Sequence, residues 1–346
     1  MRYSNVYIDS FGYELAPRVV SSADLEERLG PLYDRLHFKP GQLEALTGIR
    51  ERRYWEDDYK NCDGAVRAGR KALDASGIDP TGIGMLVYGG VCRDNLEPAT
   101  ACAVAHGLGL GGETLVYDVS NACLGVLNGM LQVANAIELG QIKAGLVVSS
   151  ESARQIVDIT IRRLLARPDM TLFKKSVATL TGGSGAVAVL LTAEALSNRG
   201  HRLLGAVIRS ATEHHRLCCW GPDTGIPASC AHIMETDSIG VLENGVGLGI
   251  ATYKALKREL GWPFDKPDKV ICHQVGATHQ RTILNAIGIS EEKDFTTFQY
   301  LGNVGTVSLP ITAAIAAERE FLQPNDLVGF LGIGSGLNCL MLGIRW

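Results

Sequence analysis

"YDVSNACLGVLNG" (residues 117–129) joins an apolar, β-branched run to a helix-forming pattern, with a cysteine at the junction. Leu124, Leu127 and later apolar residues repeat at helical spacing, which predicts a helix that begins at or just before Cys123. The unpaired N–H groups and the dipole of a helix N-terminus favour a thiolate, so we expect the pKa of Cys123 to lie well below the free value of about 8.5. Cys123 is therefore a candidate nucleophile. A structural cysteine capped by Asn121 is the alternative.

Similar apolar runs, each near a helix-period segment, recur along the chain and predict an α/β protein with largely parallel strands. They are residues 83–90, 114–120, 144–150, 185–191, 203–211, 269–275 and 327–334. One half contains a series of strand, polar turn, helix and buried strand that ends at residue 151. The other half contains a second series of the same elements, which starts at residues 295–305. This repeat predicts two similar halves that bury their central helices between two sheets. We place the halves at residues 1–182 and 183–346, with a cap insertion at residues 153–180.

The composition narrows the function classes. The chain has 346 residues, 46% of them hydrophobic and 20% charged, so we expect a globular protein with a large core. A net charge of −4 argues against nucleic-acid binding, which normally requires a basic face. We expect no secretory signal and no membrane span, because the N-terminus lacks the signal pattern and the apolar runs are short. These features predict a soluble, cytoplasmic protein.

The cysteines predict neither a disulfide framework nor a metal site. There are nine of them, an odd number, and the chain contains no C-x-x-C pair. Cys218 and Cys219 are adjacent, and His273 and His279 are six residues apart, which places the two histidines on different faces of a helix. We expect most of the cysteines to be small buried hydrophobic residues.

Two further polar residues occur where strands are predicted to end. His273 lies in "ICHQVG" at the end of an apolar run, and Asn303 lies in the glycine-flanked turn of "YLGNVG". Alone, each residue is more often structural than catalytic. Sites in α/β proteins gather at the carboxyl ends of strands, however, and Cys123 is predicted to lie there too. A cysteine, a histidine and an asparagine that meet there supply a nucleophile and two hydrogen-bond donors or proton carriers.

These motifs, in this order and spacing, resemble thiolase-fold condensing enzymes over essentially the whole chain. The motifs are "TGIRERRYW" (47–55), "DVSNACLGVLNG" (118–129), "HQVG" (273–276), "GNVG" (302–305) and "GIGSGLN" (332–338). The sequence is most similar to β-ketoacyl-ACP synthase III and to the OleA-type enzymes that condense two fatty acyl thioesters. The resemblance implies a five-layer αβαβα thiolase fold, built from two similar halves, and a homodimer.

The resemblance also implies a role for each residue. Cys123 takes the acyl group, and His273 and Asn303 hydrogen-bond the carbonyl oxygen of the second thioester as it becomes enolate-like. The backbone N–H groups of Cys123 and Ser335 form the oxyanion hole of the acyl-enzyme. The substrates are thioesters of coenzyme A or of an acyl carrier protein, and the chemistry requires no metal, nicotinamide or flavin.

Two departures from the synthase III pattern are informative. An ungapped match places Gln42 and Leu46 where that family usually has a tryptophan and an arginine that clamp the coenzyme A nucleotide. In "VCRDNLEPAT" (91–100), Glu97 precedes the proline, as in OleA-type enzymes, whose glutamate reaches into the neighbouring subunit's site. Condensation without decarboxylation needs a base for the α-proton, and a carboxylate in an apolar tunnel is a strengthened base. The alternatives are that Glu97 caps the following helix or pairs with Arg93.

We therefore expect a non-decarboxylative Claisen condensation of two acyl-CoA molecules to a β-ketoacyl product. Decarboxylative condensation with malonyl-ACP and simple acyl transfer or thioester hydrolysis are the alternatives. The cap insertion carries five cations, which form either a solvated face or a surface for phosphates or an acidic partner. They are Arg162, Arg163, Arg167, Lys174 and Lys175. An acyl carrier protein and downstream lipid-pathway enzymes are candidate partners.

Overall fold

The strands of the main sheet come from both halves of the sequence. Within the residues that the computed structural model describes, 1–198, 200–222 and 232–346, nine strands form one mixed sheet in the order β11-β12-β13-β8-β1-β7-β6-β4-β5. Their bounds are β1 Val6–Leu15, β4 Met85–Gly89, β5 Leu115–Val119, β6 Ala144–Glu151, β7 Gly185–Ala193, β8 His201–Ser210, β11 Lys269–Cys272, β12 Leu327–Gly334 and β13 Asn338–Arg345.

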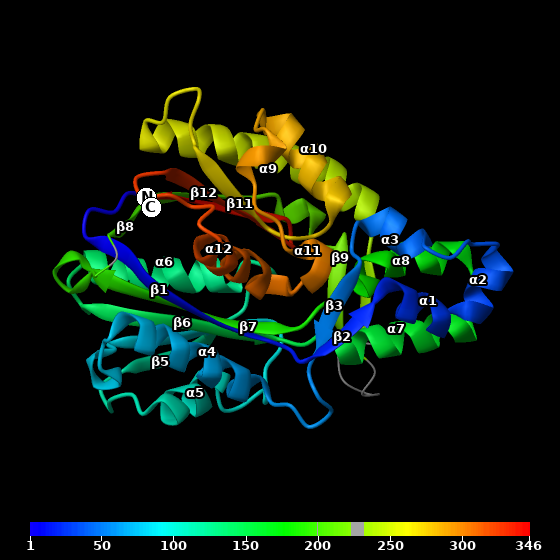
Figure 1. Ribbon diagram of the computed structural model, residues 1–346, viewed down its shortest axis with the longest axis horizontal. Helices are drawn as coiled ribbons and strands as arrows, with labels where there is room; N and C mark the ends of the chain where they lie inside the picture. Colours follow the sequence, from blue (N-terminus) through cyan, green and yellow to red (C-terminus); the bar gives the residue numbers. More distant parts are fainter. Residues whose placement is uncertain (199, 223–231) are drawn as a thin grey trace.

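A narrow seam divides this sheet into two layers. β1 pairs with β7 along its whole length, but it meets β8 through two residue pairs, Tyr7 with Arg202 and Ile8 with His201. The first layer is therefore β1-β7-β6-β4-β5, and the second is β8-β13-β12-β11. Helices lie between the layers and on both outer faces (Figure 1). This is the predicted five-layer αβαβα arrangement.

Two helices fill the space between the layers, α6 Gly125–Glu138 and α12 Ser308–Glu318. The residues of α12 from Ser308 to Ala316 are all buried, as expected for a helix that is apolar on every side and enclosed by two sheets. Side chains of α6, α12 and both layers belong to one continuous hydrophobic core. The centre of the molecule is thus shared by the two halves.

The outer helices cover the remaining face of each layer. α4 Asn61–Ser76 and α5 Thr100–Leu108 lie on the first layer, and α9 Ser238–Leu260 and α10 Ala277–Ile287 lie on the second (Figure 1). Small residues allow this close packing. A Cβ on Gly12 of β1 would lie 2.1 Å from the carbonyl oxygen of Ala68 in α4, so only glycine fits at that crossing.

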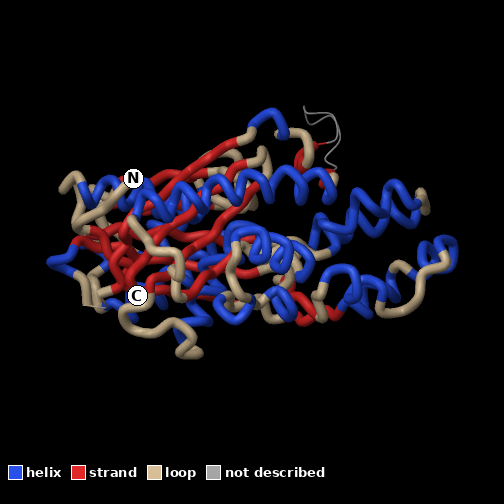
Figure 2. The backbone as a smooth tube through the Cα atoms, turned by 90° about the horizontal axis from the view of Figure 1, so that it is seen from above, coloured by secondary structure: helices blue, strands red, loops and turns tan. Residues whose placement is uncertain are grey.

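Shorter elements project beyond the strand ends and form a cap (Figures 1 and 2). They are β2 Arg18–Ser21, α1 Ser22–Arg28, α2 Gly30–Leu36, α3 Gln42–Thr47, β3 Glu51–Tyr54, α7 Arg154–Ala166, α8 Met170–Leu180, β9 Cys218–Pro222 and β10 His232–Thr236. The remaining helical elements are α11 Phe298–Leu301 and the 3₁₀ turns η1 Pro80–Gly82, η2 Glu194–Leu196, η3 Thr212–His214, η4 Glu291–Lys293 and η5 Gly305–Val307.

The seven apolar runs predicted as strands each coincide with a strand of the sheet. The prediction of largely parallel strands is wrong, because β4 with β5 and β6, and β11 with β12, are parallel, whereas the other pairs of this sheet are antiparallel.

Two local predictions are also wrong. The helix after Cys123 begins at Gly125, because the preceding residues form a turn. The stretch from residue 295 is no strand: Asp294 makes a single bridge with Val270 and α11 soon follows. There the Asp294 carboxylate, and not a backbone carbonyl, accepts the N–H of Cys272 at 3.1 Å.

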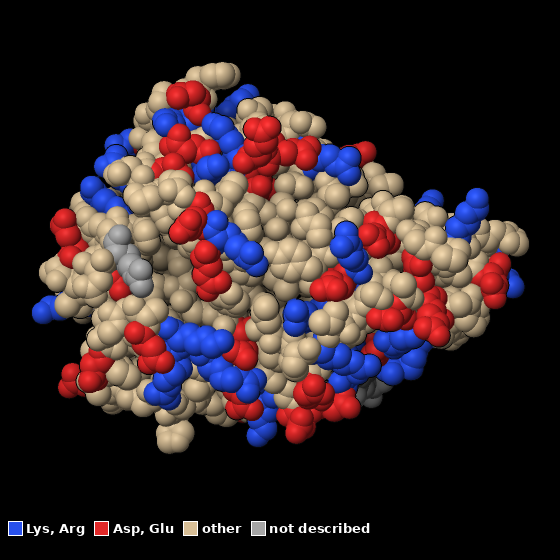
Figure 3. All heavy atoms as spheres, viewed as in Figure 1, with Lys and Arg blue, Asp and Glu red and all other residues tan. Residues whose placement is uncertain are grey.

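The predicted boundary between the halves at residue 182 stays a prediction, and the next strand, β7, pairs with β1 and β6 of the first layer. None of the described helices is both long enough and apolar enough to cross a membrane. The eight described cysteines are free thiols, and the ninth, Cys230, lies outside the described residues. On the face drawn in Figure 3, acidic and basic side chains are interspersed.

Candidate active site

Cys123 lies in the turn that joins β5 to α6. Ala122, directly before it, has a positive φ of 45°, which is uncommon for alanine and is typical of strained turns at functional sites. Gly89 ends β4 and Gly125 begins α6, and their backbones touch. A Cβ on Gly89 would lie 2.6 Å from the Gly125 carbonyl carbon. The sheet edge therefore supports the turn directly and fixes the position of the thiol.

The other half of the chain also holds the start of α6. The N–H of Val126 donates to Thr306 Oγ1 at 2.7 Å, so one first-turn N–H of the helix is already satisfied. Burial, with smaller contributions from Cys218 and Glu151, raises the pKa of Cys123 to about 12. The prediction of a lowered pKa is wrong, because desolvation outweighs the helix N-terminus. Cys123 is a thiol at rest and needs a proton acceptor to react.

His273 follows directly after β11, and its N–H donates to the carbonyl oxygen of Leu331 in β12 at 3.0 Å. Burial, followed by the effect of nearby His279, lowers the pKa of His273 to about 4. The ring is therefore neutral at neutral pH, when it can accept a proton or donate a hydrogen bond. Its Nδ1 has no hydrogen-bond partner among the described residues.

Asn303 lies in the turn between α11 and η5, and its amide is oriented by its neighbours. Its Oδ1 accepts the N–H of Gly305 at 3.0 Å and the hydroxyl of Ser308 at 3.5 Å. Its backbone N–H donates to the Thr181 carbonyl oxygen at 2.9 Å, which ties the turn to the end of α8. Because the oxygen is engaged, the Nδ2 group remains as a donor for a ligand.

Two cavities meet at Cys123. The first has mainly apolar walls that include α9, and it contains His273. The second lies against α7 and α8 of the cap and contains Glu151. Cys123, Asn303 and Ser335 line both cavities. The structure thus brings the predicted cysteine, histidine and asparagine into one site, while their catalytic roles stay predictions.

Ser335 lies in the loop between β12 and β13, next to the backbone of Cys123. A Cβ on the preceding residue, Gly334, would lie 3.4 Å from the nitrogen of Cys123. The loop turns sharply, with positive φ values of 88° at Gly336 and 45° at Leu337. This contact is compatible with the predicted oxyanion hole, which stays a prediction.

Glu97 lies outside both cavities of its own chain. It is exposed in the connection between β4 and α5, beside Leu96, which is 93% exposed. Both structural alternatives for it are wrong. Among the described residues Glu97 pairs with no cation, and the first N–H groups of α5 are capped by Asp118, which accepts from Thr100 and Ala101 at 2.9 Å. The catalytic hypothesis for Glu97 therefore requires a site other than that of its own chain.

The sequence interpretation missed Glu151 and Cys218. Glu151 closes β6, is buried and lines the second cavity, while Cys218 begins β9 and lines both cavities. A charged residue at the carboxyl end of an otherwise uncharged buried strand was the available signal for Glu151. Nothing in the sequence around Cys218 indicates that it approaches Cys123.

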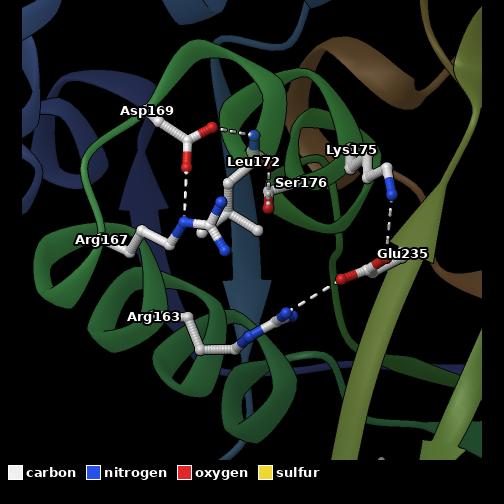
Figure 4. Close-up of polar contacts among 7 residues, drawn as sticks. All are labelled: Arg163, Arg167, Asp169, Leu172, Lys175, Ser176 and Glu235. Atoms are coloured by element: carbon white, nitrogen blue, oxygen red, sulfur yellow. Dashed lines mark hydrogen bonds and ion pairs between the residues drawn. The ribbon is translucent and has the colours of Figure 1, made fainter.

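The cap cations are largely paired within the chain. Figure 4 shows Arg163 of α7 and Lys175 of α8 converging on Glu235 of β10, at 2.9 and 3.5 Å. Arg167 pairs with Asp169, which also caps α8, at 2.9 Å. In the described part of the chain, Arg162 and Lys174 make no ion pair. Arg162, Arg167, Lys174 and Lys175 are exposed, as the solvated-face interpretation predicts, whereas Arg163 is half-buried.

The predicted nucleotide clamp positions, Gln42 and Leu46, lie on α3 of the cap, and Leu46 is exposed. The described residues include no group of three or more histidine, cysteine, aspartate or glutamate side chains that could hold a metal ion.

Comparison with known proteins extends this picture. Two family models match, 3-oxoacyl-[acyl-carrier-protein (ACP)] synthase III over residues 117–212 and its C-terminal counterpart over residues 258–346. An acyl-CoA:acyl-CoA alkyltransferase of Shewanella oneidensis is 55% identical, and one of Xanthomonas campestris is 37% identical, each over 100% of both chains. A β-ketoacyl-ACP synthase III of Natranaerobius thermophilus is 27% identical over 99% of this chain and 100% of that protein.

The structural match is equally extensive. A crystal structure of a cysteine-to-alanine variant of Xanthomonas campestris OleA has a TM-score of 0.94 and 36% identity, covering 100% of this chain and 98% of that one. Another structure of the same protein, with lauric acid and lauroyl-CoA bound, has a TM-score of 0.92, 36% identity and coverage of 99% and 100%. The chain therefore belongs to the 3-oxoacyl-ACP synthase III family of thiolase-fold condensing enzymes, in its OleA-type, acyl-CoA:acyl-CoA alkyltransferase branch.

Proposed function

We propose that this protein condenses two fatty acyl-CoA thioesters, without decarboxylation, into a β-ketoacyl product through an acyl-Cys123 intermediate. The observation that carries the proposal is the meeting of Cys123, a neutral His273 and Asn303 where two cavities join. The relatives support the substrate class, since two of them are named acyl-CoA:acyl-CoA alkyltransferases and a related structure holds lauroyl-CoA.

In the first step, Cys123 Sγ attacks the carbonyl carbon of one thioester and coenzyme A leaves as its thiol. The thiol proton needs an acceptor, because burial raises the pKa of Cys123 to about 12. Neutral His273 lines the same cavity, accepts this proton and returns it to the departing sulfur. The N–H groups of Cys123 and Ser335 stabilise the negative oxygen of the tetrahedral intermediate.

In the second step, another acyl-CoA loses an α-proton and its carbonyl oxygen gains negative charge. His273 and the Nδ2 group of Asn303 donate hydrogen bonds to that oxygen. The α-carbon then attacks the carbonyl of acyl-Cys123, a carbon–carbon bond forms, and the cysteine sulfur leaves; the α-proton that the base removed returns to this sulfur and restores the thiol. The product is a β-ketoacyl thioester of coenzyme A. Neither step needs a metal or a bound cofactor.

Glu97 of a neighbouring copy removes the α-proton in this proposal, and the active unit is a cytoplasmic homodimer. Support comes from the exposure of Glu97 and Leu96, which leaves this connection available to a second chain. β5 lies at the edge of the sheet, and Leu115 at its start is also exposed. An unpaired sheet edge flanked by apolar side chains is a surface that a second copy can extend.

The second candidate is decarboxylative condensation with malonyl-ACP, which the names of the two matching family models favour. Product analysis separates the two. Purified protein is incubated with lauroyl-CoA alone and then with malonyl-ACP added, and products are identified by mass spectrometry. We expect a β-keto product from lauroyl-CoA alone. Product only with the malonyl donor establishes the second candidate, and free fatty acid alone indicates hydrolysis and contradicts both.

A further inference from the structure

Glu151 is the one carboxylate, among the described residues, that lines either cavity at Cys123. It is 5% exposed, and both of its oxygens are engaged. The N–H of Val91 donates to Oε1 at 2.8 Å, and the N–H of Cys92 donates to Oε2 at 3.1 Å. A buried carboxylate beside the nucleophile therefore holds the backbone that follows β4.

The backbone held in this way begins the connection that carries Glu97, residues 91–99, which we call the Glu97 segment. A second anchor lies on its outer side. The Asp94 carboxylate accepts the N–H groups of Asn61 and Cys62, at the start of α4, at 2.7 and 2.9 Å. Beyond these two anchors, residues 95–98 are exposed. Glu151 from inside and Asp94 from outside thus hold the N-terminal part of the Glu97 segment, and Asp118 holds the start of α5 at its other end.

We propose that Glu151 is a positioning residue that acts on both Glu97, the proposed base, and Cys123, the proposed nucleophile. Its carboxylate fixes the inner end of the Glu97 segment and, at the same time, places a negative charge beside Cys123. The first part of this inference rests on the proposed function, in which Glu97 is the base. The second part does not.

The charge on Glu151 has a direct effect on the nucleophile. The titratable and charged groups that interact electrostatically with Glu151 are Arg93, the thiol of Cys92, Tyr88 and Cys123. Burial raises the pKa of Glu151, and the two backbone N–H groups, the thiol of Cys92 and Arg93 oppose that rise. Because each of its oxygens accepts an N–H donor, the geometry favours the ionised carboxylate. Ionised Glu151 disfavours the thiolate of Cys123 but not the uncharged thioester. It therefore keeps the free thiol protonated and favours the acyl-enzyme over the thiolate.

Three variants separate the two roles. Glu151→Gln removes the charge and one of the two acceptor oxygens. Glu151→Asp keeps the charge but is one methylene too short to reach both N–H groups. Asp94→Asn is the matched control, because it weakens the outer anchor by the same change of group and lies outside both cavities. Each is compared with wild type for coenzyme A release, for β-keto product from lauroyl-CoA and for the pH dependence of Cys123 alkylation by iodoacetamide.

In all three variants the ratio of the condensation rate to the acylation rate should fall about 10- to 100-fold below that of wild type. The reason is that a displaced Glu97 no longer lies within reach of the α-proton. Only Glu151→Gln should shift the alkylation profile to lower pH, since it alone removes a charge from the cavities that Cys123 lines, whereas Asp94→Asn removes a charge outside them. An unchanged ratio of condensation to acylation in Glu151→Gln and Glu151→Asp overturns the anchoring role, and an unmoved alkylation profile overturns the charge effect. Failure of the proposed function is recognised separately, because wild-type protein then makes no β-keto product.

Discussion

Asp294, buried beside the strand that leads to His273, should make the stability of this protein depend on pH. Its Oδ1 accepts the N–H of Cys272 at 3.1 Å, and its Oδ2 accepts from Gln280 Nε2 at 2.9 Å. Burial nevertheless raises the pKa of Asp294 from 3.8 to about 7. The folded protein holds this proton more tightly than the unfolded chain, so ionisation of Asp294 destabilises the fold.

The size of the effect follows from the two pKa values. At about 1.4 kcal/mol for each pKa unit, the difference between 3.8 and about 7 corresponds to roughly 4 kcal/mol. Wild type should lose this stability as the pH rises from about 4 to about 7. Asp294→Asn cannot ionise and keeps an oxygen for the Cys272 N–H. It should match wild type at low pH and exceed it above neutral pH, by an amount that approaches roughly 4 kcal/mol.

Urea unfolding followed by tryptophan fluorescence, at several pH values between about 4 and about 8, measures this difference. Asp268→Asn is a control of opposite sign. Although burial alone would raise the pKa of Asp268, hydrogen bonds from Lys266 and the Leu327 N–H lower it. That variant should be less stable than wild type at neutral pH, with a difference that fades on acidification. A stability difference between Asp294→Asn and wild type that stays constant across the range would refute the reasoning.

Four further predictions test the proposed site. Cys123→Ala should release no coenzyme A from lauroyl-CoA, and residual turnover would contradict an acyl-enzyme mechanism. Glu97→Gln should release coenzyme A in a single burst yet give no β-keto product; condensation at the wild-type rate would mean that another base acts. His273→Ala and Asn303→Ala should each cost condensation roughly 2–4 kcal/mol of transition-state stabilisation, read from kcat/KM, and unchanged kinetics in both would remove them from the enolate site. Gly245→Val should shift preference to shorter acyl chains, because even a Cβ there would lie 3.0 Å from Ile333 Cδ1 in the first cavity; an unchanged chain-length profile would place the acyl chain elsewhere.

The site residues that sequence patterns could locate lie in turns with a recognisable motif. Cys123 and His273 come shortly after strands, where sites of α/β proteins gather, whereas Asn303 follows the short helix α11 and was identified by its glycine-flanked turn. Their grouping into one site rested on the order and spacing of the motifs as well as on strand topology. The start of α6 was misplaced by two residues, because Asn121 to Leu124 form a strained turn that no apolar period records.

The features that sequence patterns could not locate depend on contacts between distant segments. The raised pKa of Cys123 comes from burial and from neighbours, Cys218 and Glu151, that belong to other elements. The location of Glu97 outside the cavities depends on how its segment is anchored to β6 and α4, neither of which adjoins it in the chain. Such long-range effects require the assembled fold.

The hydrogen bond from Val126 to Thr306 joins the start of α6, and with it the turn that carries Cys123, to the other half of the chain. α6 and α12 share one core, so neither layer can swing open without uncovering both helices. A copy damaged in its C-terminal half therefore loses the support of its thiol, the cavity walls and both polar donors in one event. Local unfolding of either half is therefore expected to abolish acylation and condensation together.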